Sequence, residues 1–510
     1  MKAFKTIFII NTLVTSLLLC GCKNKSNDDE NTIRIYATND IHGQIYPESS
    51  SNRIGVGKLM TFLKNKKETE KNVFLLDQGD TWQGSIYSNY NYGACITDIM
   101  NYVHYDARTI GNHDFDWGVE PLKNNTAREY NGYKTPVLAA NVYNYNFDTK
   151  QVGNIQQSDI GVPSVTYTLD NGLKVGIVGT IGQEQITSIS SLYTRDIAFT
   201  NHINVIKAEA EKLRQDGCQF VIASIHAGQK SVMNQNLGKY VDLVLCGHTH
   251  QQEDGKDSDG LKFFQYGGST NCVGYIDLKY NKDKNKVTIA RDGVYKYSQI
   301  NREVSEVDVT IQGIIDQYSH ECNVEANKIV VNNASSRFYN DKVCGNLMAK
   351  AIYDTAKKEG FDIDCAYVND PRHYLPKGKW TYADIYEAFP FDNVIYIIDI
   401  SVDDYKKEVM NYNWICKSHD QSIDLTSGHT IKVACIDYLA WHINTNRYYD
   451  YFPSVKKYTD ISSVPTLSKT YRDILTDWLI EHDYDKEGHT LLYSDFYNNN
   501  REFNKSDVIQ

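Results

Sequence analysis

Apolar runs bounded by loops alternate with amphipathic helical patterns from Thr32 to about residue 295. The runs predict strands at Ile33–Ala37, Val73–Leu76, Val137–Ala140, Val175–Val178, Phe220–Ile225 and Val241–Cys246. Helical spacing of apolar residues predicts helices over 56–66, 94–103 and 203–216. Hairpins are predicted around Asp170-Asn171-Gly172 and between Val273–Tyr280 and Val287–Ala290. This alternation predicts a layered α/β domain over residues 32–295.

A second rhythm of helices and strands follows a helical segment that we expect to link two domains over residues 296–325. Its predicted helices are 341–358, 382–388, 403–411 and 469–481, and its predicted strands are 364–368, 394–400 and 431–435. The sequence therefore predicts a second, smaller α/β domain over residues 326–510.

The first 31 residues have the composition of an export signal and a tether. Lys2 and Lys5 precede an apolar run over 7–19, which is shorter than the about 20 residues that span a bilayer. Cys22 follows a small residue, as in the cleavage box of bacterial lipoproteins, so we expect residues 1–21 to be removed and Cys22 to be lipidated. Residues 22–31 would form a tether. The alternative is an ordinary signal peptide with an incidental cysteine.

This N-terminus predicts an exported protein, periplasmic or on the cell surface, that reaches the membrane only through its N-terminal lipid. The formal net charge is −11 and there is no block of basic residues, which argues against a surface for duplex nucleic acid. A small anionic substrate stays compatible with this charge, because bound metal ions supply positive charge locally. Nine cysteines beyond the leader are scattered without a CxxC pair, so we expect most of them to be buried apolar residues.

Polar side chains follow five of the predicted strands directly at their carboxyl ends. They are Asp40, His42, Asp80, Asn112, His226, His248 and His250. In open α/β sheets a crevice outside these strand ends binds ligands, so neighbouring strands would bring the seven side chains together.

Seven oxygen and nitrogen donors exceed the three or four that one open metal site needs, which indicates two metal ions that share a carboxylate. Asp80 is the natural bridge because a carboxylate has two oxygens and a negative charge. Imidazole and carboxylate ligands favour zinc, manganese, cobalt or iron, and the absence of cysteine argues against a structural zinc site. Two such ions suit the displacement of an ester at phosphorus.

The order of these motifs resembles the calcineurin-like metallophosphoesterases. The wider frame is similar to the bacterial 5'-nucleotidase family, with its UDP-sugar hydrolase and 2',3'-cyclic phosphodiesterase relatives. The residues that carry the resemblance are Leu76-Asp77-x-Gly79-Asp80-x-x-x-Gly84, Gly111-Asn112-His113-Asp114-Phe115-Asp116 and Val137–Asn141.

The resemblance implies that one metal ion is held by Asp40, His42, Asp80 and His250, and the other by Asp80, Asn112, His226 and His248. It further implies that a water activated by the two ions attacks phosphorus. His113 would stabilise the phosphoryl group or protonate the leaving oxygen, with Asp116 as its partner. Asp114 is the competing partner for His113.

The second domain resembles the substrate-binding C-terminal domain of 5'-nucleotidases through Gly345-Asn346-Leu347, Asp364–Asn369, Arg372-x-x-Leu375-Pro376-x-Gly378 and Phe389-Pro390-Phe391-x-Asn393. The resemblance implies that Arg372 binds phosphate, as bidentate guanidinium groups do. A surface role for Arg372 is the alternative.

Two segments depart from the family pattern. Asn369-Asp370-Pro371 stands where the family has a glycine-rich stretch, and Ala440–Tyr449 replaces a Gly-Gly-Asp-Gly-aromatic loop. Tyr448, Tyr449 or Phe452 would still be able to stack on a base, with Tyr449 as the predicted substrate contact, and core packing is the alternative for each.

The leading hypothesis is hydrolysis of nucleoside 5'-monophosphates, with cyclic nucleotides and nucleotide-sugars as further substrates. A relative that hydrolyses a non-nucleotide ester is the second hypothesis, and a surface binding protein without turnover is the third.

Overall fold

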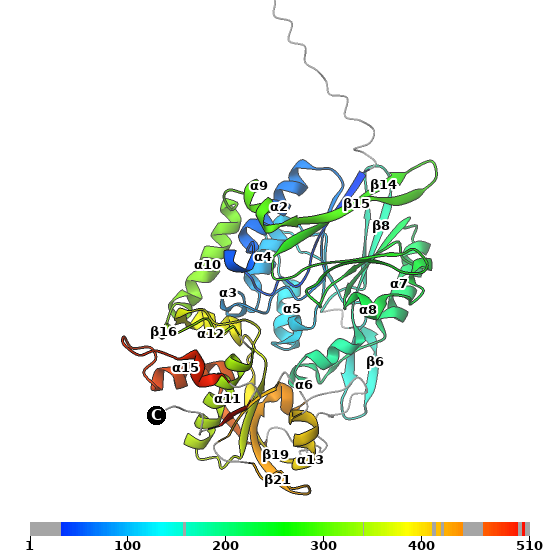
Figure 1. Ribbon diagram of the computed structural model, residues 1–510. Coiled ribbons are helices and arrows are strands. Elements are labelled where there is room, and N and C mark those ends of the chain that lie inside the picture. Colours follow the sequence, from blue (N-terminus) through cyan, green and yellow to red (C-terminus); the bar gives the residue numbers. More distant parts are fainter. Residues whose placement is uncertain are drawn as a thin grey trace, which may run out of the picture.

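The computed structural model describes residues 32–156, 160–339, 341–410, 415–419, 423–441, 463–497 and 502–504. Figure 1 shows a larger part, which contains β1 to β15, and a smaller part, which contains β16 to β23. The predicted mixed α/β fold class is confirmed. The signal segment, the tether and Cys22 lie outside the described residues.

The first sheet of the larger part has the strand order β15-β14-β1-β2-β3-β4. Strands β1 to β4 are parallel, and β14 pairs antiparallel with both β1 and β15. Along β1, buried and less buried residues alternate at first, as expected for a strand packed on one face. The bounds, in sheet order, are Lys286–Lys296, Cys272–Asn281, Thr32–Thr38, Val73–Asp77, Ala107–Thr109 and Val137–Leu138.

The second sheet has the order β12-β13-β11-β10-β8-β7. Strands β8, β10, β11 and β13 are parallel and buried, so their sequences are continuous apolar runs rather than alternating ones. The β7–β8 pair is the hairpin predicted at Asp170-Asn171-Gly172, and Gly172 has φ 87°. The bounds, in sheet order, are Gln252–Lys256, Lys262–Tyr266, Leu243–Cys246, Phe220–His226, Lys174–Ile181 and Ser164–Thr168.

The two sheets pack face to face, with a shared core that includes Ile35, Leu76, Ile222 and Phe264. Two groups of helices cover the outer faces. The first sheet is covered by α2 (Val56–Thr69), α4 (Ala94–Val103), α9 (Tyr297–Glu303) and α10 (Val309–Ala326). The second is covered by α7 (His202–Gln215) and α8 (Gln229–Val232). The convergence of the five site-bearing strands was predicted on the condition that they neighbour one another in an open sheet. They are divided between two stacked sheets, with β1, β2 and β3 in the first and β10 and β11 in the second.

The sheet of the smaller part has the order β22-β19-β21-β17-β20-β23, in which only β17–β21 and β20–β23 are parallel. In sheet order its bounds are Thr466–Thr470, Val394–Ser401, Thr430–Ile436, Cys365–Asn369, Ile415–His419 and Glu502–Asn504. Helix α11 (Asp341–Lys358) packs on β17, β20 and α15 (Tyr471–Glu481). Strands β16 (Ile329–Ala334) and β18 (Gly378–Thr381) pair beside α12 (Tyr382–Ala388).

The predicted linker is mostly helical and packed rather than extended. Asp308 caps α10 by accepting from the Thr310 and Ile311 N–H groups. Tyr318 on α10 donates to Asp98, and Ser319 accepts from Tyr46, so this helix is fixed to the larger part. Figure 1 shows α10 running down one side of the molecule towards β16 and α12. Cys322 and Ala326 at the other end of α10 pack in the core of the smaller part, so this helix contacts both parts.

The helix predicted over 403–411 is present over 402–410, but most of it is not α-helical. The structure has a three-residue α13 (Val402–Asp404) followed by a π-helical turn over Tyr405–Met410. Eight of the nine cysteines beyond the leader are buried, as expected for small apolar residues. Within the described ranges, no helix combines the length and the apolar character needed to cross a bilayer.

Candidate metal centre and substrate cavity

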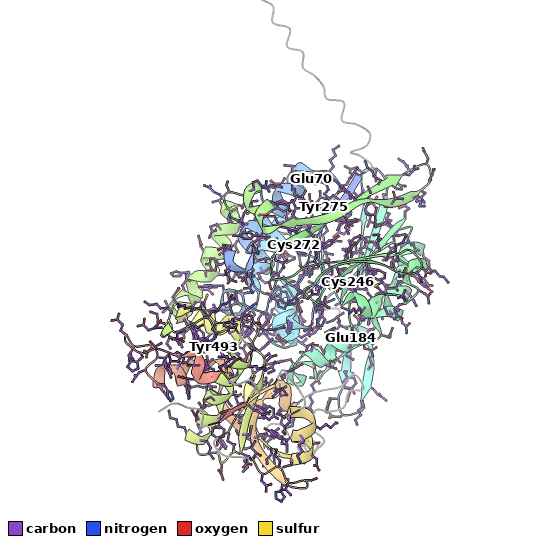
Figure 2. The ribbon with its side chains drawn as sticks, in the orientation of Figure 1. Glu70, Glu184, Cys246, Cys272, Tyr275 and Tyr493 are labelled. Atoms are coloured by element: carbon purple, nitrogen blue, oxygen red, sulfur yellow. The ribbon has the colours of Figure 1, made fainter. Side chains whose placement is uncertain are left out.

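The loops after five strands bring the seven predicted donors together. Asp40 and His42 follow β1, Asp80 follows β2, Asn112 follows β3, His226 ends β10, and the loop after β11 carries His248 and His250. Cys246, the last residue of β11, is labelled in Figure 2 and marks where this last loop begins.

One donor group consists of Asp40, His42 and His250, whose ligand atoms lie within 4.8 Å of one another. The Nε2 atoms of His42 and His250 are 2.9 Å apart, and His250 Nε2 lies 3.5 Å from Asp40 Oδ1. The second group consists of Asp80, His226 and His248 under the same distance limit. Asn112 Oδ1 lies 3.0 Å from His226 Nε2 and 3.1 Å from His248 Nδ1, so it joins this group.

Asp80 lies between the two groups. Its Oδ2 atom is 3.1 Å from His226 Nε2 and 3.8 Å from His42 Nε2. Asp80 Oδ1 accepts from the His113 N–H at 2.8 Å, whereas the buried Oδ2 atom faces imidazoles of both groups. A buried carboxylate is costly unless positive charge neutralises it, and a bound cation would supply that charge to both groups. Asp80 therefore fits the predicted role of a carboxylate shared by two ions.

The imidazoles are held in the tautomer that a metal ligand needs. His42 Nδ1 donates to the Gln83 carbonyl at 3.0 Å, and His226 Nδ1 donates to the Gln78 carbonyl at 2.7 Å. Each bond orients its ring so that Nε2 faces the donor cluster, where it would bind an ion in its deprotonated form. The close approach of the two Nε2 atoms of His42 and His250 is likewise suited to a shared cation and unfavourable without one.

Burial and neighbouring charge shift the pKa values of these ligands in different directions. Burial, helped by the nearby His226, lowers the pKa of His248 to about 3, and burial beside Arg372 lowers that of His250 to about 4. Burial also lowers the pKa of His226, but the facing carboxylate of Asp80 outweighs it and brings the value to about 9. The cluster therefore presents neutral imidazoles at neutral pH, together with one imidazole whose proton a cation would displace.

Five of the seven donors have a left-handed backbone: Asp40, His42, Asp80, His248 and His250 have φ between 50° and 84°. This region is disfavoured for residues with a Cβ and is found where a functional site requires it. Neighbouring glycines leave no room for side chains. A Cβ on Gly111 would lie 2.2 Å from Asp80 Oδ1, and one on Gly79 would lie 2.9 Å from His226 Nδ1. The loops are therefore shaped around the cluster.

A buried charge network fixes two of these loops from behind. Arg108 on β3 is 3% exposed and donates to Thr81 Oγ1 at 2.8 Å and to Asp114 Oδ2 at 2.5 Å. Asp114 also accepts from the Gly111 N–H at 2.8 Å. Asp77 accepts from the Gly79 N–H and the Thr81 hydroxyl at 3.0 and 2.8 Å. Arg108 thus connects the loop that carries Asp80 to the loop that carries Asn112.

His113 lies beside the cluster and its partner is Asp116. The His113 Nδ1 atom donates to Asp116 Oδ2 at 2.8 Å, while Asp114, the competing partner, is occupied by Arg108. Burial raises the pKa of Asp116, and the adjacent imidazole opposes that rise. Arg372, from the smaller part, donates to His113 Nε2. The predicted phosphate-binding arginine therefore lies against the predicted catalytic histidine.

A cavity of about 350 Å³ opens from these side chains and is lined by both parts of the molecule. The larger part contributes Asn112, His113, Asp116, His248, Ser188, Ser190 and Tyr193. The smaller part contributes Arg372, Phe391 and Tyr438, together with residues 369–371, 392 and 393. The Phe391 ring centroid lies 5.4 Å from that of His113 and 5.4 Å from the Arg372 Cζ atom.

Several lining residues had no predicted role. Phe391 belongs to the motif Phe389-Pro390-Phe391-x-Asn393, which carries the resemblance of the second domain, but no role was predicted for it. Ser190, Tyr193 and Tyr438 have no local pattern that distinguishes them from other surface or core residues. Tyr449, the predicted base contact, and Tyr448 and Phe452 with it, lie outside the described residues.

Residues 33–252 match the family model described as calcineurin-like phosphoesterase. A 5'-nucleotidase from Mus musculus is 27% identical over 322 residues, which are 56% of this chain and 52% of that protein. The larger part of this chain is therefore similar to calcineurin-like phosphoesterases and to 5'-nucleotidases. The matched range contains all seven donors, and its end at residue 252 lies just after the last of them, His250.

Further relatives extend the likeness beyond residues 33–252. Endonuclease YhcR from Bacillus subtilis (strain 168) is 25% identical over 413 residues, which are 74% of this chain and 32% of that protein. The chain thus spans about a third to about half the length of these two relatives. The structure of a 5'-nucleotidase precursor from Thermus thermophilus has a TM-score of 0.73 at 17% identity and covers 93% of this chain and 99% of its own. That likeness establishes the two-part fold.

Proposed function

We propose that this chain hydrolyses phosphate monoesters of nucleosides, with its two donor groups as a dinuclear metal centre. The observation that carries the proposal is the position of the buried Asp80 carboxylate, whose Oδ2 atom faces both groups of ligand atoms beside the cavity that Asn112 and His248 line. Buried carboxylates and neutral imidazoles in this number suit two divalent ions such as zinc, manganese, cobalt or iron.

Asp40, His42, Asp80 and His250 would hold one ion, and Asp80, Asn112, His226 and His248 the other. When bound, the two ions supply positive charge that polarises the phosphoryl group and lowers the pKa of water. Asp80 and Asp40 together offset part of that charge. The left-handed loops and the tautomer-fixing carbonyls hold the donors in place before any ion arrives.

Arg372 and His113 would act on the phosphoryl group from the other side. Because Arg372 donates to His113 Nε2, a phosphoryl oxygen that enters between them meets two hydrogen-bond donors at once when the imidazole is protonated. Asp116 fixes Nδ1 as a donor, so a proton on Nε2 is free to pass to the leaving oxygen. The leaving alcohol then departs into the cavity that Phe391 borders.

The cavity suits a nucleoside as the leaving group. Phe391 and Tyr438 supply aromatic faces for a base, and Asn369 and Asn393 supply amide groups for its polar edge. About 350 Å³ lies within the range of small-molecule sites. Cyclic nucleotides and nucleotide-sugars are further candidate substrates of the same centre. The replaced loop at 440–449 favours the second candidate function, a phosphatase for non-nucleotide esters.

Phosphate release from AMP, UMP, a cyclic 2',3'-nucleotide, UDP-glucose and p-nitrophenyl phosphate at pH 7.5 tests the proposal, with manganese and with chelator. We expect metal-dependent turnover that prefers AMP or UMP, and a loss of roughly 10²- to 10⁴-fold in the His113→Ala variant. Turnover of p-nitrophenyl phosphate alone would support the non-nucleotide phosphatase. No turnover of any ester with added manganese, zinc or cobalt would leave only a binding protein.

We further propose that the protein is an exported lipoprotein with Cys22 as the lipidated residue. Its support is the basic and apolar N-terminal pattern that ends at Leu19-Cys20-Gly21-Cys22. A Cys22→Ser variant is expected to leave the membrane fraction and to stop incorporating labelled fatty acid. Membrane retention and labelling equal to those of the parent protein would refute the lipid anchor.

A further inference from the structure

Arg472 is a buried guanidinium that lies behind the wall of the cavity and does not line it. It belongs to α15 and is 4% exposed. A fully buried arginine is retained only where its donors are satisfied, because an unpaired buried charge is strongly unfavourable. The partners of Arg472 therefore show what its charge holds in place.

Those partners are concentrated in the loop between α12 and β19. Arg472 Nη1 donates to the backbone carbonyls of Phe389 and Phe391 at 3.2 and 2.9 Å, and Nη2 donates to Asp392 Oδ1 at 2.7 Å. Three of the four residues from 389 to 392 thus bond to one side chain. The planar, forked geometry of a guanidinium can reach several acceptors at once, which an ammonium group cannot reproduce.

The guanidinium is itself fixed by aromatic residues of α12. Its Nε atom donates to the Tyr382 hydroxyl at 3.2 Å, and its Cζ atom lies 3.7 Å from the Tyr386 ring centroid. Tyr382 in turn donates to Asp473 at 2.7 Å. The loop is therefore supported by a rigid contact between two helices, α12 and α15, rather than by a strand ladder.

Phe391 is the side chain that this loop presents to the cavity. It lies beside His113 and Arg372, where the leaving group of the substrate would be. Asn89 of the larger part donates to the Pro390 carbonyl at 3.1 Å, so the loop is also held from the opposite side. These bonds hold the backbone from which the Phe391 ring extends towards His113.

We propose that Arg472 is a positioning residue that sets the place of Phe391 and thereby the preference for esters with a planar base over small esters. The inference rests on the proposed function for its substrate and on the contacts of residues 389–392 for its mechanism. It assigns Arg472 no contact with the phosphoryl group, so the chemistry at phosphorus is left unchanged by its substitution.

The test compares kcat/KM for AMP with kcat/KM for p-nitrophenyl phosphate in the Arg472→Lys and Asp392→Asn variants. We expect the ratio of AMP to p-nitrophenyl phosphate to fall roughly tenfold in Arg472→Lys, mainly through KM for AMP, and less in Asp392→Asn. Phe391→Ala should lower the ratio by roughly 5- to 100-fold. In the Phe391→Ala background, Arg472→Lys should change the ratio no further.

Arg214→Lys is the matched control. Arg214 also donates to two backbone carbonyls, those of Cys218 and Gln219, and to one carboxylate, Asp242, but it belongs to α7 in the larger part. The Arg214→Lys variant should leave the ratio of kcat/KM for AMP to that for p-nitrophenyl phosphate unchanged. Equal loss for both esters in Arg472→Lys, with a lowered melting temperature, would assign Arg472 a merely structural role and overturn the inference.

A second readout does not depend on the substrate. Fluorophenylalanine at position 391 reports the surroundings of the ring by ¹⁹F NMR, and Arg472→Lys should shift or broaden its resonance while Arg214→Lys should not. An unchanged resonance would refute the positioning role even if AMP is not hydrolysed. A changed resonance without AMP hydrolysis would support the role of Arg472 and separately refute the nucleotide substrate.

Discussion

The cluster of seven donor side chains and the opposite wall of the cavity are built in different ways. The donors of the cluster lie at the ends of five strands, and five of the seven have left-handed backbone, with tight glycine contacts and a buried charge network behind them. The wall formed by Arg372, Phe391 and Tyr438 comes from the other part of the molecule. Hydrogen bonds between the two parts include those from Ser190 to Asp437 at 2.7 Å, from Arg53 to His373 at 2.8 Å and from Asn89 to the Pro390 carbonyl at 3.1 Å.

This difference separates two demands on the protein. A metal centre needs donors fixed within tenths of an ångström, which a dense and strained network provides. A substrate wall has to match one leaving group and to admit and release it, which is a common role of loops from a second domain. We therefore expect substitutions in the cluster to abolish turnover of all esters, and substitutions in the wall to change which ester is preferred.

The largest effect is expected from Asp80→Ala, because both donor groups lose their shared carboxylate. Turnover of every ester should fall on the order of 10³-fold or more, and bound metal per chain should drop below that of the parent. Phosphate release measures the turnover, and elemental analysis of the purified protein measures the bound metal. Asp283→Ala, at an exposed position in the β14–β15 turn, is the control. Full metal content in Asp80→Ala would contradict a shared ligand.

Arg108→Gln tests whether the charge network behind the cluster holds the donor side chains in position. It leaves the buried carboxylate of Asp114 without its cation, so we expect a loss of about 3–5 kcal/mol in unfolding free energy. Metal affinity should fall roughly 10- to 100-fold, as for other residues that orient ligands. Activity should recover at high metal concentration, and titration of metal against turnover measures this. A variant that is destabilised but has the parent's metal affinity would show that the network supports only the fold.

Replacement of Arg372 by alanine is expected to have a smaller effect that differs in kind. Loss of its charge-assisted bonds should raise KM for phosphate monoesters roughly 10- to 100-fold. Metal content should stay at the parent's level, because Arg372 is not among the donors. Initial rates across a range of AMP concentrations check the first expectation and elemental analysis the second. An unchanged KM would refute phosphate binding by Arg372 and favour the alternative of a surface role.

The same contrast explains what the sequence predicts. Asp40, Asp80 and Asn112 each follow a recognisable apolar strand, and strand ends converge whatever the details of packing. Even so, the sequence alone did not reveal that the strands are divided between two sheets, because pairing partners far apart in the chain leave no local pattern. Asp114 and Asp116 both lie close enough in the chain to pair with His113, and only the position of Arg108 distinguishes them.

The wall is less predictable because its residues meet only in the folded chain. Ser190 and Tyr438 are separated by almost half of the sequence and yet line one cavity. Arg372 was found through a family motif rather than through a physical pattern. Arg472 is a helix residue with an ordinary composition around it, and its role is visible only from the carbonyls that it reaches.

The smallest effect concerns Asp437, whose carboxylate accepts from Ser190 across the boundary between the two parts. Burial raises the pKa of Asp437 to about 6, although the Ser190 hydrogen bond opposes the rise, and the residue is 1% exposed. A raised pKa means that the folded protein binds this proton more tightly than the unfolded chain does. The resulting stabilisation is present below about pH 4 and is lost as the pH rises through about 6.

Asp437→Asn keeps an oxygen for the Ser190 hydroxyl and removes the titration. Relative to the parent, we expect the variant to be equally stable at pH 4 and more stable at pH 8, by about 1–3 kcal/mol. Unfolding by denaturant at both pH values measures the difference, and a Ser190→Ala variant separates the loss of the hydrogen bond from the loss of charge. A difference between parent and variant that is the same at both pH values would mean that Asp437 is not the titrating group. Turnover should stay close to the parent's, because the bond across the boundary is retained and neither the donors nor His113 change.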